Sequence, residues 1–149
     1  MTYELLNPSD WQNAKVTKDD VADFLFEHLD QYGDKREDIM KCIEYALSEQ
    51  DGKGGFITVA YENPDNILGA VIINDTGMAG YIPENILVYI AVHGDARGKG
   101  VGKGLMNAVM DRVSGDIALH VEPDNPARYL YEKLGFTNKY LEMRWKNDR

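Results

Sequence analysis

Residues 92–104 read Val-His-Gly-Asp-Ala-Arg-Gly-Lys-Gly-Val-Gly-Lys-Gly, and they follow directly on an apolar run from Ile86 to Val92. Apolar residues recur at helical spacing immediately afterwards, which predicts a helix from about Gly100 to Val113. Glycines, which lack a Cβ atom, let the backbone bend sharply and bring its N–H groups close to a ligand. The first N–H groups of a helix have no internal partners and lie at the positive end of its dipole. The stretch therefore predicts a strand-to-helix turn that binds an anion.

The spacing of the glycines narrows the choice of anion. A P-loop needs Gly-Lys followed by Ser or Thr, whereas both Gly-Lys pairs here are followed by glycine, which excludes a P-loop. A dinucleotide fingerprint counted from Gly98 has Lys103 where its third glycine belongs, so that match is weak. Arg97, Lys99 and Lys103 add positive charge around the turn. A pyrophosphate remains a suitable ligand for such a turn.

The turn resembles the acyl-CoA signature of the GNAT N-acetyltransferase superfamily, Arg/Gln-x-x-Gly-x-Gly/Ala. Residues 97–102 match it as Arg-Gly-Lys-Gly-Val-Gly. The surroundings resemble the family too, with Ile-Ala-Val at 90–92 and Val-Glu-Pro-Asp-Asn-Pro-Ala-Arg-Tyr-Leu-Tyr-Glu-Lys-Leu-Gly-Phe at 121–136. The resemblance covers roughly Ile86 to Phe136, and the amino-terminal half matches in pattern only.

The resemblance implies the GNAT fold, of the α/β (α+β) class. This is a mixed, mostly antiparallel central sheet of six to seven strands, flanked by about four helices, with a splayed central strand pair. Local patterns agree, including a capping box formed by Thr17 and Asp20. We expect strands at Thr2–Leu6, Gly55–Tyr61, Ile67–Ile73, Ile86–Val92 and Ile117–Val121, helices at Lys18–Gln31, near Ile39–Leu47, at Gly100–Val113 and from Pro126 to Gly135, and a closing hairpin from Phe136–Thr137 and Tyr140–Trp145.

Length and composition limit the other possibilities. The 149 residues, 44% of them apolar, predict a single domain over 1–149. The net charge of −9 argues against a nucleic-acid partner. No window approaches the ~20 apolar residues of a membrane span, and the start lacks a basic region followed by an apolar run. We therefore expect a cytoplasmic protein with no membrane partner and no metal, and with its single Cys42 as a small buried hydrophobe.

The acidity is confined to the first part of the chain. Residues 1–66 hold 15 acids and 6 bases, whereas residues 67–149 hold 10 of each. The acidic part is either a solvated surface or a face that attracts a cationic substrate. The resemblance implies that the first two helices line the acceptor side, where the candidate side chains are Glu27, Asp30, Tyr32, Asp34, Glu37 and Asp38.

The resemblance further implies acetyl transfer from acetyl-CoA, a cosubstrate, to a primary amine of a small molecule or peptide by direct attack in a ternary complex. In the family, the backbone of the central strand pairs with the pantetheine arm, which places Ile90 and Val92 at the cofactor through main-chain groups. Asn125 resembles a CoA-contacting asparagine, with local helix capping as the alternative. The residues expected to bind the cofactor are Ile90, Ala91, Val92, Arg97, Gly98, Lys99, Gly100, Val101, Gly102, Lys103, Asn125 and Tyr131.

Tyr131 matches the family's tyrosine that protonates the leaving thiolate, with helix packing as the alternative. A phenol with a pKa of about 10 stays protonated at neutral pH and can still donate to a thiolate. The general base is left open, because Tyr89 and Glu84 on or before the central strand compete with His120 and Glu122 on the next one. His93 is assigned to the turn instead of the chemistry.

Two other functions stay open at this stage. A non-catalytic acyl-CoA-binding regulatory module would keep the cofactor turn without turnover, and Tyr131 argues against it. A transferase of a longer acyl group needs more room around the thioester, which the sequence does not reveal. Small members of the family commonly form homodimers, so a second copy is a partner to test.

Overall fold

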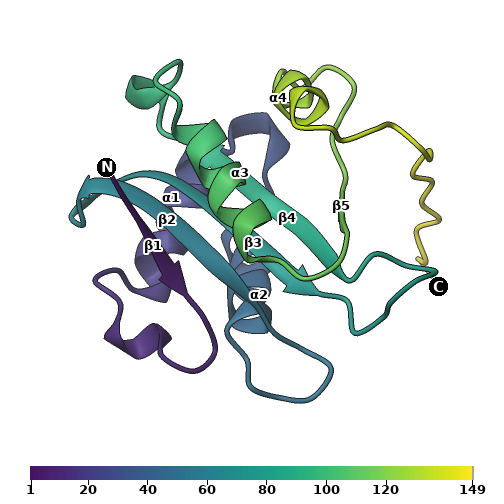
Figure 1. Cartoon of the computed structure of the whole chain (residues 1–149), viewed down its shortest axis with the longest axis horizontal. Helices are drawn as coiled ribbons and strands as arrows, with labels where there is room; N and C mark the ends of the chain where they lie inside the picture. Colours follow the sequence, from purple (N-terminus) through teal and green to yellow (C-terminus); the bar gives the residue numbers. More distant parts are fainter. Residues whose placement is uncertain (149) are drawn as a thin grey trace. The chain divides into compact units, whose positions relative to one another are not determined.

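The first 119 residues are built on one five-stranded sheet, whose strands lie in chain order (Figure 1). Strands β1 to β4 pair antiparallel, and β5 pairs parallel to β4. The computed structural model describes residues 1–148, and the residues from His120 onward form a second unit. The strands are β1 (Thr2–Leu6), β2 (Gly55–Asn63), β3 (Asn66–Asp75), β4 (Asn85–Val92) and β5 (Ile117–Leu119).

Helices cover both faces of this sheet, with α3 in front and α1 and α2 behind in Figure 1. Because both faces are covered, the middle strands are apolar almost without interruption, as Val71, Ile72 and Ile73 illustrate. The main core lies between the sheet and the first two helices. The helical elements of this unit are η1 (Trp11–Asn13), α1 (Lys18–His28), η2 (Asp30–Tyr32), α2 (Arg36–Ala46), η3 (Gly94–Ala96) and α3 (Val101–Arg112).

The predicted capping box at the start of α1 is confirmed. The Asp20 N–H donates to Thr17 Oγ1 at 3.0 Å, and the Thr17 N–H donates to Asp20 Oδ2 at 2.9 Å. These two bonds satisfy N–H groups that have no partner inside the helix. The helix ends at His28, earlier than the predicted Gln31, because the chain tightens into η2.

The third helix lies close to the sheet because β3 carries a glycine beneath it. A Cβ atom on Gly69 would lie 2.8 Å from Val101 Cγ1 and 2.9 Å from Leu105 Cδ1. Any larger residue would push the helix away from the strands. Since α3 begins at Val101, this packing also fixes where the glycine-rich turn ends.

The second unit contains one helix, α4 (Ala127–Lys133), and no strand within the described residues. The prediction of a closing hairpin is therefore wrong, and the described sheet has five strands instead of six to seven. An alternating pattern forms a strand only where another edge supplies hydrogen bonds, and here the segment finds none. Its large apolar side chains are exposed at Tyr140, Leu141, Met143 and Trp145.

The division into two units leaves the single GNAT domain over 1–149 as a prediction. Strand β5 stops at Leu119, two residues before the predicted Val121, and His120 starts the second unit. Within residues 1–148, no helix is long and apolar enough to cross a membrane. Cys42 is buried, in keeping with its predicted role as a small hydrophobe.

Candidate active site

Strand β4 loses its neighbour part-way along its length. It pairs with β5 at three positions only, ending with Leu87 opposite Leu119. From there to Val92 it is paired with β3 on one side, and β5 does not follow it on the other. Within residues 1–119, β4 therefore has an open edge after Leu87. The splay of the central strands stays a prediction, because β5 itself ends at Leu119.

The direction of the main-chain groups on this open edge follows from one hydrogen bond. The His93 N–H donates to Leu68 O of β3 at 2.8 Å. Residues of an antiparallel strand turn their N–H and C=O groups alternately toward and away from the neighbour. Ala91 therefore faces β3 as His93 does, while Ile90 and Val92 face the open side. Arg97 Nε reaches Val92 O at 3.4 Å, which agrees with this alternation.

A β-bulge lies where the pairing with β5 ends. Leu87 is opposite Ile73 and Tyr89 is opposite Ile72, so Val88 is an extra residue without a counterpart in β3. The side chains of Val88 and Tyr89 both pack in the core beneath α1 and α2. Bulges redirect side chains and interrupt pairing next to active sites, and this one turns Tyr89 toward the acidic helices.

The glycine-rich turn follows the open edge directly. Gly98 and Gly100 adopt φ values of +79° and +82°, which L side chains rarely adopt. Both glycines border open space, since a Cβ atom on either would meet no heavy atom within 4 Å. The i→i−4 hydrogen bonds of α3 begin with the Gly104 N–H, which donates to Gly100 O at 2.9 Å. The N–H groups just before it have no i−4 partner and are available to an anion.

Charged side chains surround this turn. Lys99 and Lys103 are exposed, and the side chain of Arg97 is 58% exposed. The Arg97 guanidinium lies 3.6 Å from Asp30 in η2, which links the acidic region to the turn. His93 is held inside the turn, because its Nδ1 accepts from the Asp95 N–H at 3.1 Å. Its ring also packs at a tilt against His28, with 4.3 Å between centroids, a contact that sequence reasoning missed.

Tyr89 points from the open end of β4 to a carboxylate. Its hydroxyl donates a hydrogen bond to Asp34 Oδ2, in the loop between η2 and α2. Burial raises the pKa of Tyr89 well above its usual value, and the bond to Asp34 raises it further. Tyr89 is therefore a hydrogen-bond donor at neutral pH and a poor candidate for the base. The sequence named Asp34 as one of several candidate carboxylates on the acceptor side, but no local signal links it to Tyr89, 55 residues away.

Glu84, the other leading candidate for the base, lies at the opposite end of β4. Its Oε1 accepts a hydrogen bond from the Asp116 N–H at 3.0 Å. This backbone hydrogen bond lowers the pKa of Glu84, which makes its carboxylate a weaker base. The geometry gives Glu84 the task of holding the start of β5, away from the glycine-rich turn.

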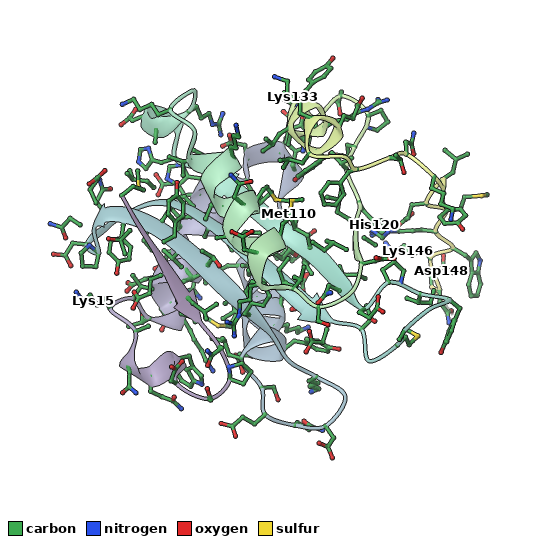
Figure 2. All side chains as sticks on the ribbon, in the orientation of Figure 1. Lys15, Met110, His120, Lys133, Lys146 and Asp148 are labelled. Atoms are coloured by element: carbon green, nitrogen blue, oxygen red, sulfur yellow. The ribbon has the colours of Figure 1, made fainter. Side chains whose placement is uncertain are left out.

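The remaining candidates lie in the second unit. Asn125 Oδ1 accepts from the Ala127 N–H at 2.9 Å, a local contact at the start of α4, whose N-cap residue is Pro126. Tyr131 is 6% exposed, and burial raises its pKa to about 12. Its ring lies 5.8 Å from that of Phe136, centroid to centroid. His120, which follows β5 directly (Figure 2), is exposed, as is Glu122.

The strand, glycine-rich turn and helix described above contain two of the motifs on which the sequence resemblance rests, at 90–92 and 97–102. A model of the acetyltransferase (GNAT) domain matches residues 53–138, more than half of the chain. The chain belongs to the GNAT acetyltransferase family. Members of this family use acyl-CoA, and the open main-chain groups of Ile90 and Val92 and the free N–H groups of the turn fit its pantetheine arm and pyrophosphate.

Solved structures share the GNAT fold over nearly the whole chain. The ribosomal-protein-alanine N-acetyltransferase of Brucella melitensis biovar Abortus 2308 is 22% identical, with a TM-score of 0.65 over 98% of this chain and 99% of that one. An aminoglycoside N-acetyltransferase in complex with CoA is 15% identical, with a TM-score of 0.69 over 99% and 96%. Another, from an uncultured soil metagenomic sample in complex with sisomicin, is 15% identical, with a TM-score of 0.61 over 99% and 95%. No curated protein sequence matches the chain.

Proposed function

We propose that this GNAT protein transfers the acetyl group of acetyl-CoA to a primary amine by direct attack in a ternary complex. The observation that carries the proposal is the open end of β4, which leads through the short η3 into the glycine-rich turn. One end of a ligand can pair with the strand while its phosphates reach the N–H groups of the helix. This continuity matches an acyl-CoA better than a nucleotide or a free phosphate, which have no arm to pair with a strand.

The open end of β4 and the glycine-rich turn bind different parts of this cosubstrate. The main-chain groups of Ile90 and Val92 pair with the arm, and an N–H on this edge can stabilise the charge that develops on a carbonyl oxygen. The turn from Gly98 to Lys103 binds the pyrophosphate, with Arg97 as a charged partner. Acetyl-CoA, when bound, supplies the activated acetyl thioester.

Tyr131 is the proposed proton donor for the leaving thiolate. Burial raises its pKa to about 12, so it keeps its proton at neutral pH. It is a weaker acid than a free phenol, because its pKa lies further above the thiol's value of about 8.5. We therefore assign the transfer to the moment when charge develops on sulfur, when a positioned donor is most effective.

The acceptor is a primary amine on a small molecule or a peptide. The acidic side chains on α1, η2 and α2 support a cationic acceptor, because exposed carboxylates attract amines over a distance of about 8–10 Å at physiological salt. The similar structures named above include proteins that act on aminoglycosides and on ribosomal protein alanine. Both classes of amine therefore belong in the test.

The decisive experiment measures free thiol release from acetyl-CoA with a panel of polycationic, neutral and anionic amines, each at low and high salt. Turnover with a cationic amine that weakens as salt rises supports the proposal. Acetyl-CoA binding without thiol release with any amine would favour the non-catalytic module instead. Faster turnover with a longer acyl-CoA would favour the alternative acyl donor, and light scattering on the same samples reports whether the protein is a homodimer.

A further inference from the structure

The hydrogen bond between Tyr89 and Asp34 joins two parts of the molecule that have different tasks. Tyr89 belongs to the open end of β4, and only 9% of it is exposed. Asp34 is exposed and precedes α2 in a loop of the acidic region. The hydroxyl of Tyr89 thus fixes a solvent-accessible carboxylate one side chain away from the strand that is to hold the acetyl group.

The arginines on either side of this region are engaged elsewhere. Arg36 donates to Asp19 Oδ1 at 2.9 Å and to Asp23 Oδ1 at 2.7 Å. Arg97 is paired with Asp30. Asp34 therefore has Tyr89 as its hydrogen-bonded partner within the described residues, and its second oxygen is not held by an arginine. A carboxylate in this situation can accept a proton or a hydrogen bond from an incoming amine.

The other titratable groups beside Tyr89 do not compete for this role. Burial raises the pKa of Cys42 to about 12, so its thiol stays protonated, and its Sγ accepts from Asn74 Nδ2 at 3.5 Å. The charge of Asp38 also raises the pKa of Tyr89, but its carboxylate lies 3.5 Å from Lys41 on the surface of α2. Asp34 is thus the carboxylate of this group that is held in a fixed direction relative to β4.

We propose that Asp34 is the general base of the acetyl transfer and that Tyr89 is the residue that positions it. This inference rests on the proposed function and names the group that the sequence left open. A base must be held within hydrogen-bond reach of the proton it removes, and the bond from a buried strand residue provides that constraint. The exposed side of Asp34 leaves room for the amine to approach.

The proton balance defines what Asp34 does. The acceptor starts as an alkylammonium, and Asp34 takes one proton from its nitrogen and passes it to solvent. The nitrogen lone pair then forms the N–C bond to the thioester carbonyl carbon, and the C–S bond breaks with its electron pair on sulfur. The second nitrogen proton balances the proton that the sulfur receives. The products are an N-acetyl amine, a thiol and one released proton.

The test compares Asp34→Asn with the wild-type protein across pH. Removing a general base should lower kcat at neutral pH by about 10²–10⁴-fold. The residual kcat should rise in proportion to hydroxide, since hydroxide replaces the missing carboxylate. Asp34→Glu should recover part of the loss. Tyr89→Phe keeps the ring but frees the carboxylate, so it should lower kcat less than Asp34→Asn does. It should also keep the acid limb of the pH profile, which is the fall in kcat at low pH.

Asp38→Asn is the matched control, because it removes the same charge beside Tyr89 from a carboxylate that Tyr89 does not contact. It should leave the acid limb in place. Two readouts do not depend on turnover. Calorimetry should give the same acetyl-CoA affinity for Asp34→Asn and wild type. In protein with carbon-13 tyrosine, Tyr89 should titrate at a lower pH in Asp34→Asn, because the negative charge beside its hydroxyl, which raises its pKa, is removed.

The outcomes separate the base from its alternatives. A loss in Asp34→Asn that falls entirely on KM, with kcat and the pH profile unchanged, would make Asp34 an amine-binding residue and overturn the inference. An unchanged Tyr89 titration would also overturn it, since the positioning bond would then be absent in solution. If wild-type protein binds acetyl-CoA but acetylates no amine, the proposed function fails and the inference fails with it. If wild-type protein acetylates an amine and the Asp34 variants do so equally well, the proposed function stands and the inference alone is overturned.

Discussion

The two ends of strand β4 have similar apolar sequences and opposite roles. At the amino end, Asn85 is 5% exposed and donates from Nδ2 to Ser114 O at 2.8 Å and to Asp116 O at 3.1 Å. Its own N–H also donates to Asp116 O at 3.1 Å. With Glu84 accepting from the Asp116 N–H, this end is tied to β5 by both backbone and side chains.

The carboxyl end has none of these ties. After Leu87 the pairing with β5 stops, Val88 bulges, and Ile90 and Val92 turn their main-chain groups to the open side. An open edge inside a sheet is costly unless something pairs with it. The proposed binding site thus lies where the pairing of two strands ends, next to an end of β4 that is tied to its neighbour.

The largest expected effect concerns the proposed proton donor for the leaving thiolate, which lies outside β4. The Tyr89 hydroxyl is engaged by Asp34, and Tyr131 of the second unit is the proposed proton donor. Tyr131→Phe keeps the ring while removing the proton, and kcat should fall by about 10²–10⁴-fold with little change in acetyl-CoA affinity. Tyr129→Phe on the same helix is the control. Normal turnover in Tyr131→Phe would leave Tyr131 as a packing residue.

The next effect should fall on the turn beyond the open end. Gly100→Val forces a β-branched residue to a φ of +82°, and acetyl-CoA affinity in calorimetry should fall by about five- to thirtyfold, given a cost of ~1–2 kcal/mol. Gly52→Val, at a φ of +84° and also in open space, imposes the same strain away from the turn and should leave affinity unchanged. Equal losses in both variants would mean that strain, and not the turn, governs binding.

Arg97→Ala tests the charge beside the same turn. A charge-assisted hydrogen bond contributes about 1.5–3 kcal/mol, and the exposure of Arg97 and its pairing with Asp30 favour the lower value. We expect acetyl-CoA to bind about tenfold more weakly to this variant, with a reduced dependence on salt. Unchanged affinity and unchanged salt dependence would remove Arg97 from the cofactor site.

A substitution at the amino end of β4, which is tied to β5, should lower stability and leave acetyl-CoA binding unchanged. Asn85→Ala removes the side-chain donor to the carbonyls of Ser114 and Asp116, which should lower the free energy of unfolding by about 0.5–1.5 kcal/mol in urea titrations. Acetyl-CoA affinity should stay close to that of the wild type. A loss of affinity as large as that of Gly100→Val would show that the two ends of β4 are not separable.

Most of the elements of residues 1–119 could be predicted because their signals are local. The capping box of Thr17 and Asp20, the helical spacing before and after Gly33, and the glycines from Gly98 onward each act within a few residues. The turn that is expected to hold the cofactor was readable for the same reason. Such features need no knowledge of the rest of the fold.

What could not be predicted depends on distant partners. The contact of Asp34 with Tyr89 spans 55 residues, and the end of β5 at Leu119 depends on where the chain leaves the sheet. The alternation from Tyr140 to Trp145 resembled a strand, yet alternation does not supply a neighbouring edge. The same limit hid the structural task of Glu84, whose partner Asp116 lies 32 residues away.

The most direct test of the account follows the exchange of the β4 amide hydrogens with and without saturating acetyl-CoA. In the free protein, the Ala91 amide faces β3 and should be protected, while the Ile90 and Val92 amides should exchange faster. Acetyl-CoA should protect Ile90 and Val92, because the arm supplies the missing partner on the open side. Unchanged exchange at both residues, with protection elsewhere in the chain, would contradict the claim that the open end of β4 holds the acyl donor.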